Sequence, residues 1–289
     1  MERPRLPDWL RNVSVHGAAT HGTRQVLRRH GLNTVCEEAR CPNRGECFSR
    51  HTATFLILGD SCTRGCGFCA VDHRPPHPPD PAEPAAIARA AAELDLRYLV
   101  ITSVTRDDLP DGGAGHFAAV IRAARAARPG LRVEVLVPDF QGDAAAARTV
   151  LAAAPDVFNH NVETVPRLYP AVRPQADYAR SLAVLRQAAD WRPAVPVKSG
   201  LMVGLGEERG EVMAVLGDLR AAGVMLVTIG QYLQPRRGNL PVVRYVHPDE
   251  FRAYERDAMA LGFQGVFAGP LVRSSYLAEQ LFRPDPGGA

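Results

Sequence analysis

The chain has 289 residues, long enough to bury a large core and of a length that one α/β barrel would use completely. Its 34 lysine and arginine residues against 31 aspartate and glutamate residues give a net charge of +3, which leaves no strong basic footprint for nucleic acid. No apolar run resembles a signal peptide or a membrane span, so we expect a soluble, cytoplasmic protein with neither nucleic-acid nor membrane partners.

The N-terminal extension, residues 1–50, is predicted to be irregular apart from a short helix over residues 23–30. It carries a first cysteine triplet, Cys36, Cys41 and Cys47. The segment around this triplet has too few apolar side chains to fold alone. We therefore expect a metal centre to order it.

A second triplet, Cys62, Cys66 and Cys69, lies in a glycine-containing loop after the first predicted strand. Its C-x3-C-x2-C spacing suits one face of a cubane iron–sulfur cluster whose fourth iron is left to bind a small molecule. All six cysteines fall between positions 36 and 69, unlike the spread of a secreted disulfide framework. Zinc is the better competitor, but neither triplet has paired C-x2-C knuckles, so two iron–sulfur sites are the leading interpretation.

From residue 52 onward, apolar β-rich runs alternate with alanine- and leucine-rich helical segments. Six strands are predicted, over residues 54–58, 97–103, 132–137, 157–161, 195–203 and 225–231. Six helices are predicted, over residues 84–94, 115–127, 143–153, 177–189, 207–222 and 248–261. Because a closed barrel needs about eight such units, this alternation predicts an α/β fold with a partial (β/α)6 barrel, open on one side to a large or protein-borne substrate. The barrel would span residues 51–262, followed by a C-terminal extension, 263–289, with a disordered end.

Catalytic groups of parallel α/β barrels gather at the carboxyl ends of the strands, so polar residues there are candidate ligand contacts. Thr102 and Ser103 end the second predicted strand; their hydroxyls suit a zwitterionic ligand, although ordinary βα loops are rich in such residues. After the fourth strand, Asn161 and Glu163 are favoured as ligand contacts, and His160, on the opposite side, as a packed histidine.

Lys198, the only lysine in the sequence, precedes a glycine-rich turn. A buried ammonium facing a carboxylate would be functional, and a chance surface lysine is the alternative. Gly204, Gly206 and Gly210 do not have the G-x-G-x-x-G spacing of a dinucleotide site. A backbone surface that admits a flat adenine is the preferred interpretation.

With these residues in view, the chain resembles the lipoyl synthase family of the radical S-adenosylmethionine (SAM) superfamily, from about residue 8 to residue 276. The resemblance rests on the second cysteine triplet, with Phe68 before its last cysteine, and on the first triplet in its setting Val-Cys-Glu-Glu-Ala-x-Cys-Pro-Asn. Further support comes from segments 106–114, 159–161, 198–207 and 231–235, and from the terminal motif Arg273-Ser274-Ser275-Tyr276.

The resemblance implies that Cys62, Cys66 and Cys69 hold a [4Fe-4S] cluster whose open iron binds SAM and whose electron cleaves it to methionine and a 5′-deoxyadenosyl radical. The expected cofactor contacts are Phe68, Thr102, Ser103, Asn161, Glu163 and Lys198. An auxiliary [4Fe-4S] cluster is implied on Cys36, Cys41, Cys47 and Ser275. Its oxygen ligand is harder than thiolate and easier to detach, which suits a cluster that is dismantled as the sulfur source.

The implied reaction inserts sulfur at C6 and then C8 of an octanoyl group on a lysine of a lipoyl-carrier domain. Implied partners are such domains of 2-oxoacid dehydrogenase E2 subunits and the glycine cleavage H protein, a low-potential donor such as ferredoxin or flavodoxin, and cluster-assembly proteins. Two alternatives remain: another radical enzyme, similar to biotin synthase or a methylthiotransferase, and a non-catalytic iron–sulfur electron carrier. Asn239 stands where the family often has histidine; asparagine does not titrate near neutrality, so an acid–base role there is in doubt.

Overall fold

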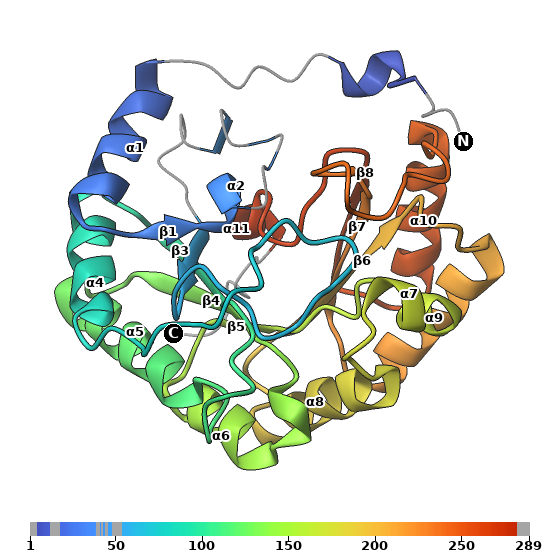
Figure 1. Ribbon diagram of the computed structural model, residues 1–289. Coiled ribbons are helices and arrows are strands. Elements are labelled where there is room, and N and C mark those ends of the chain that lie inside the picture. Colours follow the sequence, from blue (N-terminus) through green and yellow to red (C-terminus); the bar gives the residue numbers. More distant parts are fainter. Residues whose placement is uncertain are drawn as a thin grey trace.

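One curved sheet of eight strands, in the order β1 to β8, organises the chain in the computed structural model (Figure 1). The structure describes residues 5–11, 18–38, 41, 43, 46–47 and 54–281. β1 (Asn33–Thr34) pairs antiparallel with β2, and all later neighbours are parallel. The parallel strands are β2 (Thr54–Ile57), β3 (Tyr98–Ser103), β4 (Arg132–Leu136), β5 (Val157–Asn159), β6 (Val197–Val203), β7 (Leu226–Gln231) and β8 (Gly265–Gly269). The strand order ends at β1 and β8, so the barrel is open between them.

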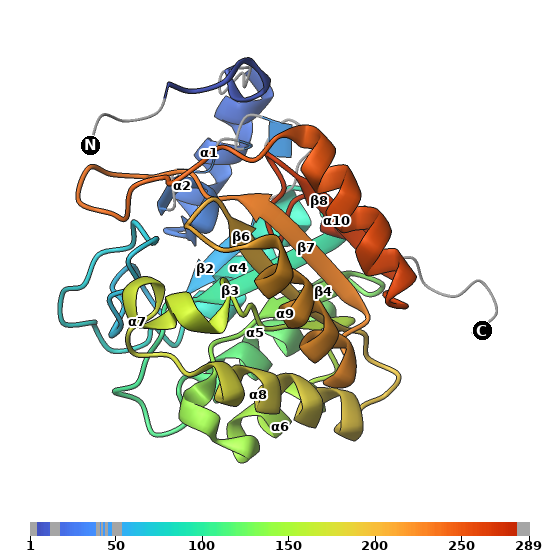
Figure 2. The ribbon, with the colours of Figure 1, turned by 90° about the vertical axis from the view of Figure 1, so that its right-hand side faces the viewer.

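Helices cover the outer face of this sheet, and Figure 2 shows α9 and α10 lying over the β6–β8 side. The covering helices are α4 (Glu83–Glu93), α5 (Ala114–Ala127), α6 (Ala144–Ala152), α8 (Tyr178–Trp191), α9 (Arg209–Ala221) and α10 (Pro248–Ala260). Asp143 and Asp177 cap α6 and α8 through their side chains, which accept from Ala145 N and Arg180 N. Short elements complete the chain: η1 (Asp8–Leu10), α1 (Ala18–Arg29), α2 (Val35–Glu38), η2 (Phe140–Gly142), η3 (Pro166–Leu168), α7 (Tyr169–Val172) and α11 (Ala278–Leu281).

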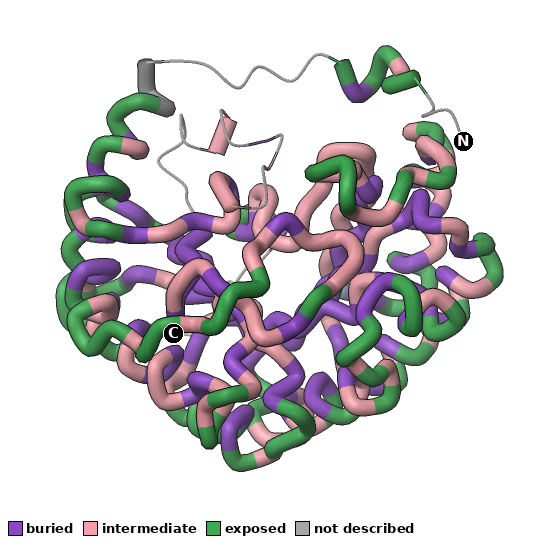
Figure 3. The backbone as a smooth tube through the Cα atoms, in the orientation of Figure 1, coloured by how far each residue is buried: buried purple, intermediate pink, exposed green. Residues whose placement is uncertain are grey.

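The two faces of the strands pack against different partners. Leu99 and Ile101 of β3 belong to the main core, which includes the buried residues of α4 and α5. Tyr98 and Val100, which alternate with them, contact Ala278 of α11 instead. Strands β2 to β7 are accordingly buried almost throughout, β8 is mostly half-buried, and the outer faces of the helices are exposed (Figure 3).

The C-terminal segment enters the barrel, where Figure 1 shows α11 among the strands. Glycines on the inward face make room for it. A Cβ added at Gly230 would lie 2.2 Å from the carbonyl oxygen of Val272, and one at Gly265 would lie 3.0 Å from Leu281 Cδ1. These glycines therefore permit a close approach that no other residue would allow.

The predicted open α/β barrel is confirmed, and each of the six predicted strands and helices overlaps an observed element. The helix expected over residues 23–30 overlaps α1, which begins earlier and ends at Arg29. β8 was not predicted, and it falls in the segment assigned to the C-terminal extension although it pairs with β7. The expected disordered end, and parts of the first cysteine segment, lie outside the described residues. No helix in the described part of the chain is long and apolar enough to cross a membrane.

Candidate active site

The loop with Cys62, Cys66 and Cys69 follows β2 at the carboxyl edge of the sheet, and backbone N–H groups point at its sulfur atoms. Cys62 Sγ accepts from Arg64 N (3.4 Å) and Thr105 N (3.3 Å), and Cys69 Sγ accepts from Val71 N (3.4 Å). No disulfide joins these three described thiols. Donors of this kind stabilise the charge on cluster-bound thiolates and tune their potential.

Burial makes two thiols of the cysteine loop weaker acids than usual. Burial raises the pKa of the Cys69 thiol to about 12 and also raises that of Cys66, where the charge of Arg173 acts in the opposite direction. A metal centre must therefore displace protons as it binds. Among the described residues, no three histidine, cysteine or acidic side chains converge as a site for one metal ion.

Phe68 and the glycine turn after β6 share one apolar wall. Phe68 packs against a cluster that contains Val172, Leu205 and Tyr232. The turn is held by Glu207, whose carboxylate accepts from Gly204 N (2.6 Å) and Leu205 N (2.9 Å). The aromatic residue of the cysteine loop and the predicted adenine surface are thus brought together.

Asn161 and Glu163 form the polar side of the site. Asn161 Nδ2 donates to Glu163 Oε1 (3.0 Å), while Asn161 Oδ1 is buried without a partner among the described residues. Glu163 has a left-handed φ of 65°, held by backbone hydrogen bonds to Gly200 O (3.0 Å) and from Met202 N (2.8 Å). Such a strained non-glycine residue is typical of a ligand site. Burial raises the pKa of Glu163, against the charge of Arg173 and the hydrogen bond from Asn161.

Arg173, at the end of α7, was not predicted as a site residue. Its side chain is 9% exposed, and its Nη1 donates to Asn161 O (3.0 Å) and Val162 O (3.2 Å). Its Nε is buried and has no hydrogen-bond partner in the described structure. The charge of Arg173 acts on both Cys66 and Glu163, which places a buried cation between the cysteine loop and the polar side. The other candidates were selected because they lie at the carboxyl ends of strands. Arg173 follows α7, which is a helix, so that criterion did not select it.

Ser103 and His160 each have a buried polar atom without a partner among the described residues, whereas the hydroxyl of Thr102 is hydrogen-bonded. Thr102 Oγ1 donates to Leu136 O (2.9 Å), and Ser103 Oγ is buried without a partner in the described chain. His160 is packed, as predicted, with its Nδ1 2.8 Å from Val137 O, but its Nε2 is not satisfied by any described residue. Buried polar atoms of this kind are usually completed by water or a ligand.

Lys198 is buried against a carboxylate, and the alternative of a surface lysine is wrong. Its Nζ lies 2.8 Å from Glu134 Oε1, and both side chains are 1% exposed. Tyr98 O–H and Asn159 Nδ2 donate to the same carboxylate, at 2.7 Å and 3.3 Å. Lys198 is the second residue of β6, about 16 Å along the strand from its rim end. The structure therefore assigns it a partner inside the barrel, away from the cysteine loop.

The first triplet meets the terminal motif in a second pocket. This pocket is lined by Cys36, Cys41, Asn43, Cys47, Thr54, Arg273, Ser275 and Tyr276. Asn43 Nδ2 donates to Leu271 O (2.6 Å) across 228 positions of sequence, and Tyr276 O–H donates to Glu46 Oε2 (3.0 Å). Burial, followed by the charge of Cys41, raises the pKa of the Cys36 thiol to about 12. Three thiols and three hydroxyl groups, those of Thr54, Ser275 and Tyr276, thus line one pocket.

Asn239, which follows β7, holds the backbone of the cysteine loop by hydrogen bonds. Its Nδ2 donates to Gly67 O (3.2 Å) and Cys69 O (2.7 Å), and Leu240 N donates to Gly67 O (3.0 Å). A Cβ at Gly67 would lie 2.9 Å from Ala171 O and from Leu240, so this glycine lets the segments touch. Asn239 serves here as a neutral donor, a role that needs no titration.

Replacing Asn239 with aspartate is expected to destabilise the apoprotein by about 1–3 kcal/mol, because a carboxylate would face two carbonyl oxygens and donate to neither. Asn239→His, which keeps one N–H donor, should lose less. Urea unfolding of the two variants beside the unchanged chain measures both effects. Equal stability of Asn239→Asp and the unchanged chain would show that these hydrogen bonds do not hold the loop.

Comparisons with known proteins agree with this geometry. Residues 56–219 match the Radical SAM superfamily profile. Curated proteins named lipoyl synthase are similar over almost the whole chain. The one from Laribacter hongkongensis is 54% identical over 98% of this chain and 90% of its own, and the one from Acidithiobacillus ferrooxidans is 56% identical over 97% and 89%.

Solved structures share the fold at low sequence identity. Methylornithine synthase (PylB) is similar with a TM-score of 0.57 and 12% identity over 89% of this chain and 76% of its own. HydG, a maturase of the [FeFe]-hydrogenase, is similar with a TM-score of 0.60 and 15% identity over 74% of this chain and 50% of its own. At this identity the likeness concerns the barrel alone.

Proposed function

The chain belongs to the lipoyl synthase family of radical SAM enzymes, and from that premise we propose that it inserts sulfur at C6 and C8 of an octanoyl group bound to a lipoyl-carrier domain. The family assignment makes it an enzyme of lipoyl cofactor synthesis that uses a [4Fe-4S] cluster and SAM. The observation that carries the finer proposal is the second pocket, in which Cys36, Cys41 and Cys47 meet Ser275. A radical enzyme that needed only one cluster would have no use for this arrangement.

Cys62, Cys66 and Cys69 would hold the first cluster, and Cys36, Cys41, Cys47 and Ser275 the second. When bound, the first supplies the electron that cleaves SAM, and the second supplies sulfur. The N–H groups of Arg64, Thr105 and Val71 orient and stabilise the first set of thiolates.

The polar side of the site suits the methionine part of SAM. The unpartnered Asn161 Oδ1 and the Glu163 carboxylate are acceptors for its ammonium group, and Thr102, on the same face of β3 as Tyr98 and Val100, offers a hydroxyl. Ser103 alternates with Thr102 and faces the helices, so we leave it out of this set. Arg173, with its unused Nε, is a donor for the carboxylate. Phe68 and the Gly204–Gly206 turn provide an apolar wall for adenine. We leave Lys198 out of this set because it faces Glu134 inside the barrel.

In the second set, Ser275 has a distinct role. A serine oxygen is harder than thiolate and binds iron of a sulfur cluster less tightly, so it is the ligand most readily lost when the cluster gives up sulfur. Arg273, half-buried in the lining of the same pocket, places a positive charge near Cys41. Loss of solvation lowers the pKa of Arg273, and the charge of Cys41 acts in the opposite direction. The thiolates of a loaded site would therefore offset the effect of desolvation on this pKa.

The shape of the barrel favours a substrate that arrives on a carrier. α11 packs beside Tyr98, Val100 and Gly265 inside the barrel, so an acyl chain has to enter from the carboxyl edge, where the loop with Cys62, Cys66 and Cys69 lies. An octanoyl group on a lysine arm meets this requirement. The proposed partners are octanoylated E2 subunits and glycine cleavage H protein, a ferredoxin or flavodoxin as donor, and cluster-assembly proteins.

Product analysis under anaerobic conditions tests the proposal. Reconstituted protein with SAM, dithionite and an octanoylated lipoyl domain should yield 5′-deoxyadenosine and a lipoyl group, with the unmodified domain as the control. SAM cleavage that leaves the octanoyl domain unchanged would remove this substrate and favour another radical enzyme. An iron–sulfur protein that cleaves no SAM would instead be an electron carrier.

A further inference from the structure

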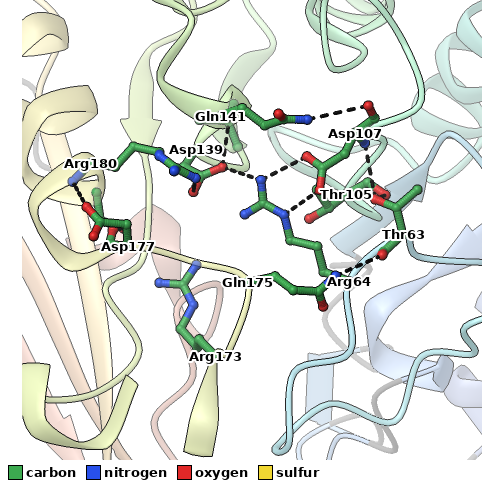
Figure 4. A network of polar contacts seen from close by, with 12 residues as sticks. Thr63, Arg64, Thr105, Asp107, Asp139, Gln141, Arg173, Gln175, Asp177 and Arg180 are labelled. Carbon is green, nitrogen blue, oxygen red and sulfur yellow. Dashed lines mark hydrogen bonds and ion pairs between the residues drawn. The ribbon is translucent and has the colours of Figure 1, made fainter. Parts of the chain in front are cut away.

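Arg64, between the first two cysteines of the loop, turns inward and pairs with two carboxylates (Figure 4). Its Nε lies 2.6 Å from Asp107 Oδ2, and its Nη2 lies 2.8 Å from Asp107 Oδ1 and 2.7 Å from Asp139 Oδ1. The Arg64 side chain is 5% exposed and that of Asp139 is fully buried. A buried arginine in so short a cluster loop has no ligand role, so its function must lie in these pairs.

The pairs continue into a chain of alternating charges. Asp139, which follows β4, also accepts from Arg180 Nη1 of α8 (3.3 Å) and from Gln141 N (3.1 Å). Burial alone would raise the pKa of Asp139, but the hydrogen bond and charge of Arg64 outweigh it and hold the pKa at about 2. Asp139 is therefore ionised at any physiological pH, and the sequence Asp107, Arg64, Asp139, Arg180 is a balanced set of two anions and two cations.

Neutral hydrogen bonds tie the same loop to the same surroundings. Thr63 Oγ1 donates to Thr105 O (2.9 Å) and accepts from Asp107 N (3.1 Å), so the loop after β3 is joined to the cysteine loop twice. Gly65 N donates to Gln175 Oε1 (2.6 Å), from the segment before α8. The turn with Cys62 and Cys66 is thus fixed to segments after β3, β4 and β5.

We propose that Arg64 is a positioning residue: its pairs with Asp107 and Asp139 fix the cysteine loop in its cluster-binding shape before any cluster is present. Arginine is required because its planar guanidinium reaches two carboxylates at once, which a lysine ammonium does not do with the same geometry. Loss of Arg64 leaves Asp139 buried with half its cationic partners, and the loop separates to admit water. The inference rests on the proposed function only in placing a cluster on Cys62, Cys66 and Cys69.

Hydrogen–deuterium exchange on the apoprotein tests this pre-organisation without any cluster. The amides of Cys62, Thr63, Gly65, Gly67 and Cys69 all donate hydrogen bonds, so the peptide over residues 60–70 should exchange slowly in the unchanged chain. Arg64→Met should speed its exchange at least about tenfold, with β6 unaffected, and Arg64→Lys should recover part of the protection.

Arg125→Met is the matched control, because it removes an arginine that pairs with an aspartate, Asp156 (2.7 Å), away from the loop. It should leave exchange of the 60–70 peptide unchanged. The double variant Arg64→Met, Asp139→Asn should exchange no faster than Arg64→Met alone if the two residues act as one unit. Equal exchange of Arg64→Met and the unchanged chain overturns the proposal.

The loaded protein gives a second readout. Arg64→Met should broaden the electron paramagnetic resonance spectrum of the reduced cluster and weaken the change that SAM causes in it, and kcat for 5′-deoxyadenosine should fall about 100-fold. Identical spectra and rates for Arg64→Met and the unchanged protein count against the inference. If the unchanged protein itself assembles no cluster on the loop, the proposed function fails instead, and the exchange result still decides whether Arg64 fixes the loop.

Discussion

Replacing Cys62, Cys66 and Cys69 together by alanine is expected to abolish 5′-deoxyadenosine formation, by at least about 10⁶-fold, the lower end of enzymatic rate enhancement. These thiols are the only proposed ligands of the cluster that binds SAM and delivers the electron, and the second cluster, with four proposed protein ligands, leaves no open iron for SAM. Formation of the lipoyl group should disappear with it. Anaerobic chromatography of 5′-deoxyadenosine, with dithionite as reductant, measures the loss.

The same variant should keep its second cluster, so its iron content should fall from about eight to about four atoms per chain. Cys36, Cys41 and Cys47 lie in a separate pocket with Ser275, and none of the second triplet lines it. The reciprocal variant, with alanine at the first triplet, is the matched control and should retain 5′-deoxyadenosine formation. Persistent SAM cleavage by the variant that lacks Cys62, Cys66 and Cys69 would mean that the electron comes from a different source.

The outline of the barrel could be predicted because its signals are local. Alanine-rich helices alternate with strands rich in β-branched residues, and the composition of each segment indicates whether it is a helix or a strand. β8 gave no such signal because Gly265 and Gly269 weaken strand propensity. The need for Gly265 arises only in the fold, where Leu281 lies against it. The glycine in β8 is required by a segment from the end of the chain that packs against the strand. The residues of β8 by themselves therefore do not identify it as a strand.

Within the site, too, some residues could be predicted from local sequence and others depend on the fold. The cysteine loop was predictable because its three thiols lie within eight positions of one another. The partners that shape the loop were not, since Asp107, Asp139 and Asn239 come from three different loops and each is an ordinary loop residue by itself. A buried Lys198 facing a carboxylate was one of two alternatives, and only the register of β4, β5 and β6 identifies that carboxylate as Glu134. Ser275 was identified solely by family resemblance.

Replacing Ser275 by alanine is expected to separate the two half-reactions. SAM cleavage should continue, because none of the residues around Cys62, Cys66 and Cys69 is altered. Lipoyl formation should fall at least about 100-fold, since even partners outside the metal's own ligands are worth 10–100-fold. Mass spectrometry of the carrier domain, beside 5′-deoxyadenosine from the same reaction, measures both products at once.

Ser274→Ala is the matched control: Ser274 adjoins Ser275 in the terminal motif but does not line the pocket. It should retain both activities. Ser275→Cys tests whether this ligand has to detach, because a thiolate binds iron more firmly than a serine oxygen does. That variant should load its second cluster fully and still transfer less sulfur, since the ligand that must leave would now be held. Full lipoyl formation by Ser275→Cys would show that detachment of this ligand is not needed, and equal losses in Ser275→Ala and Ser274→Ala would show that the hydroxyl of Ser275 is not a ligand.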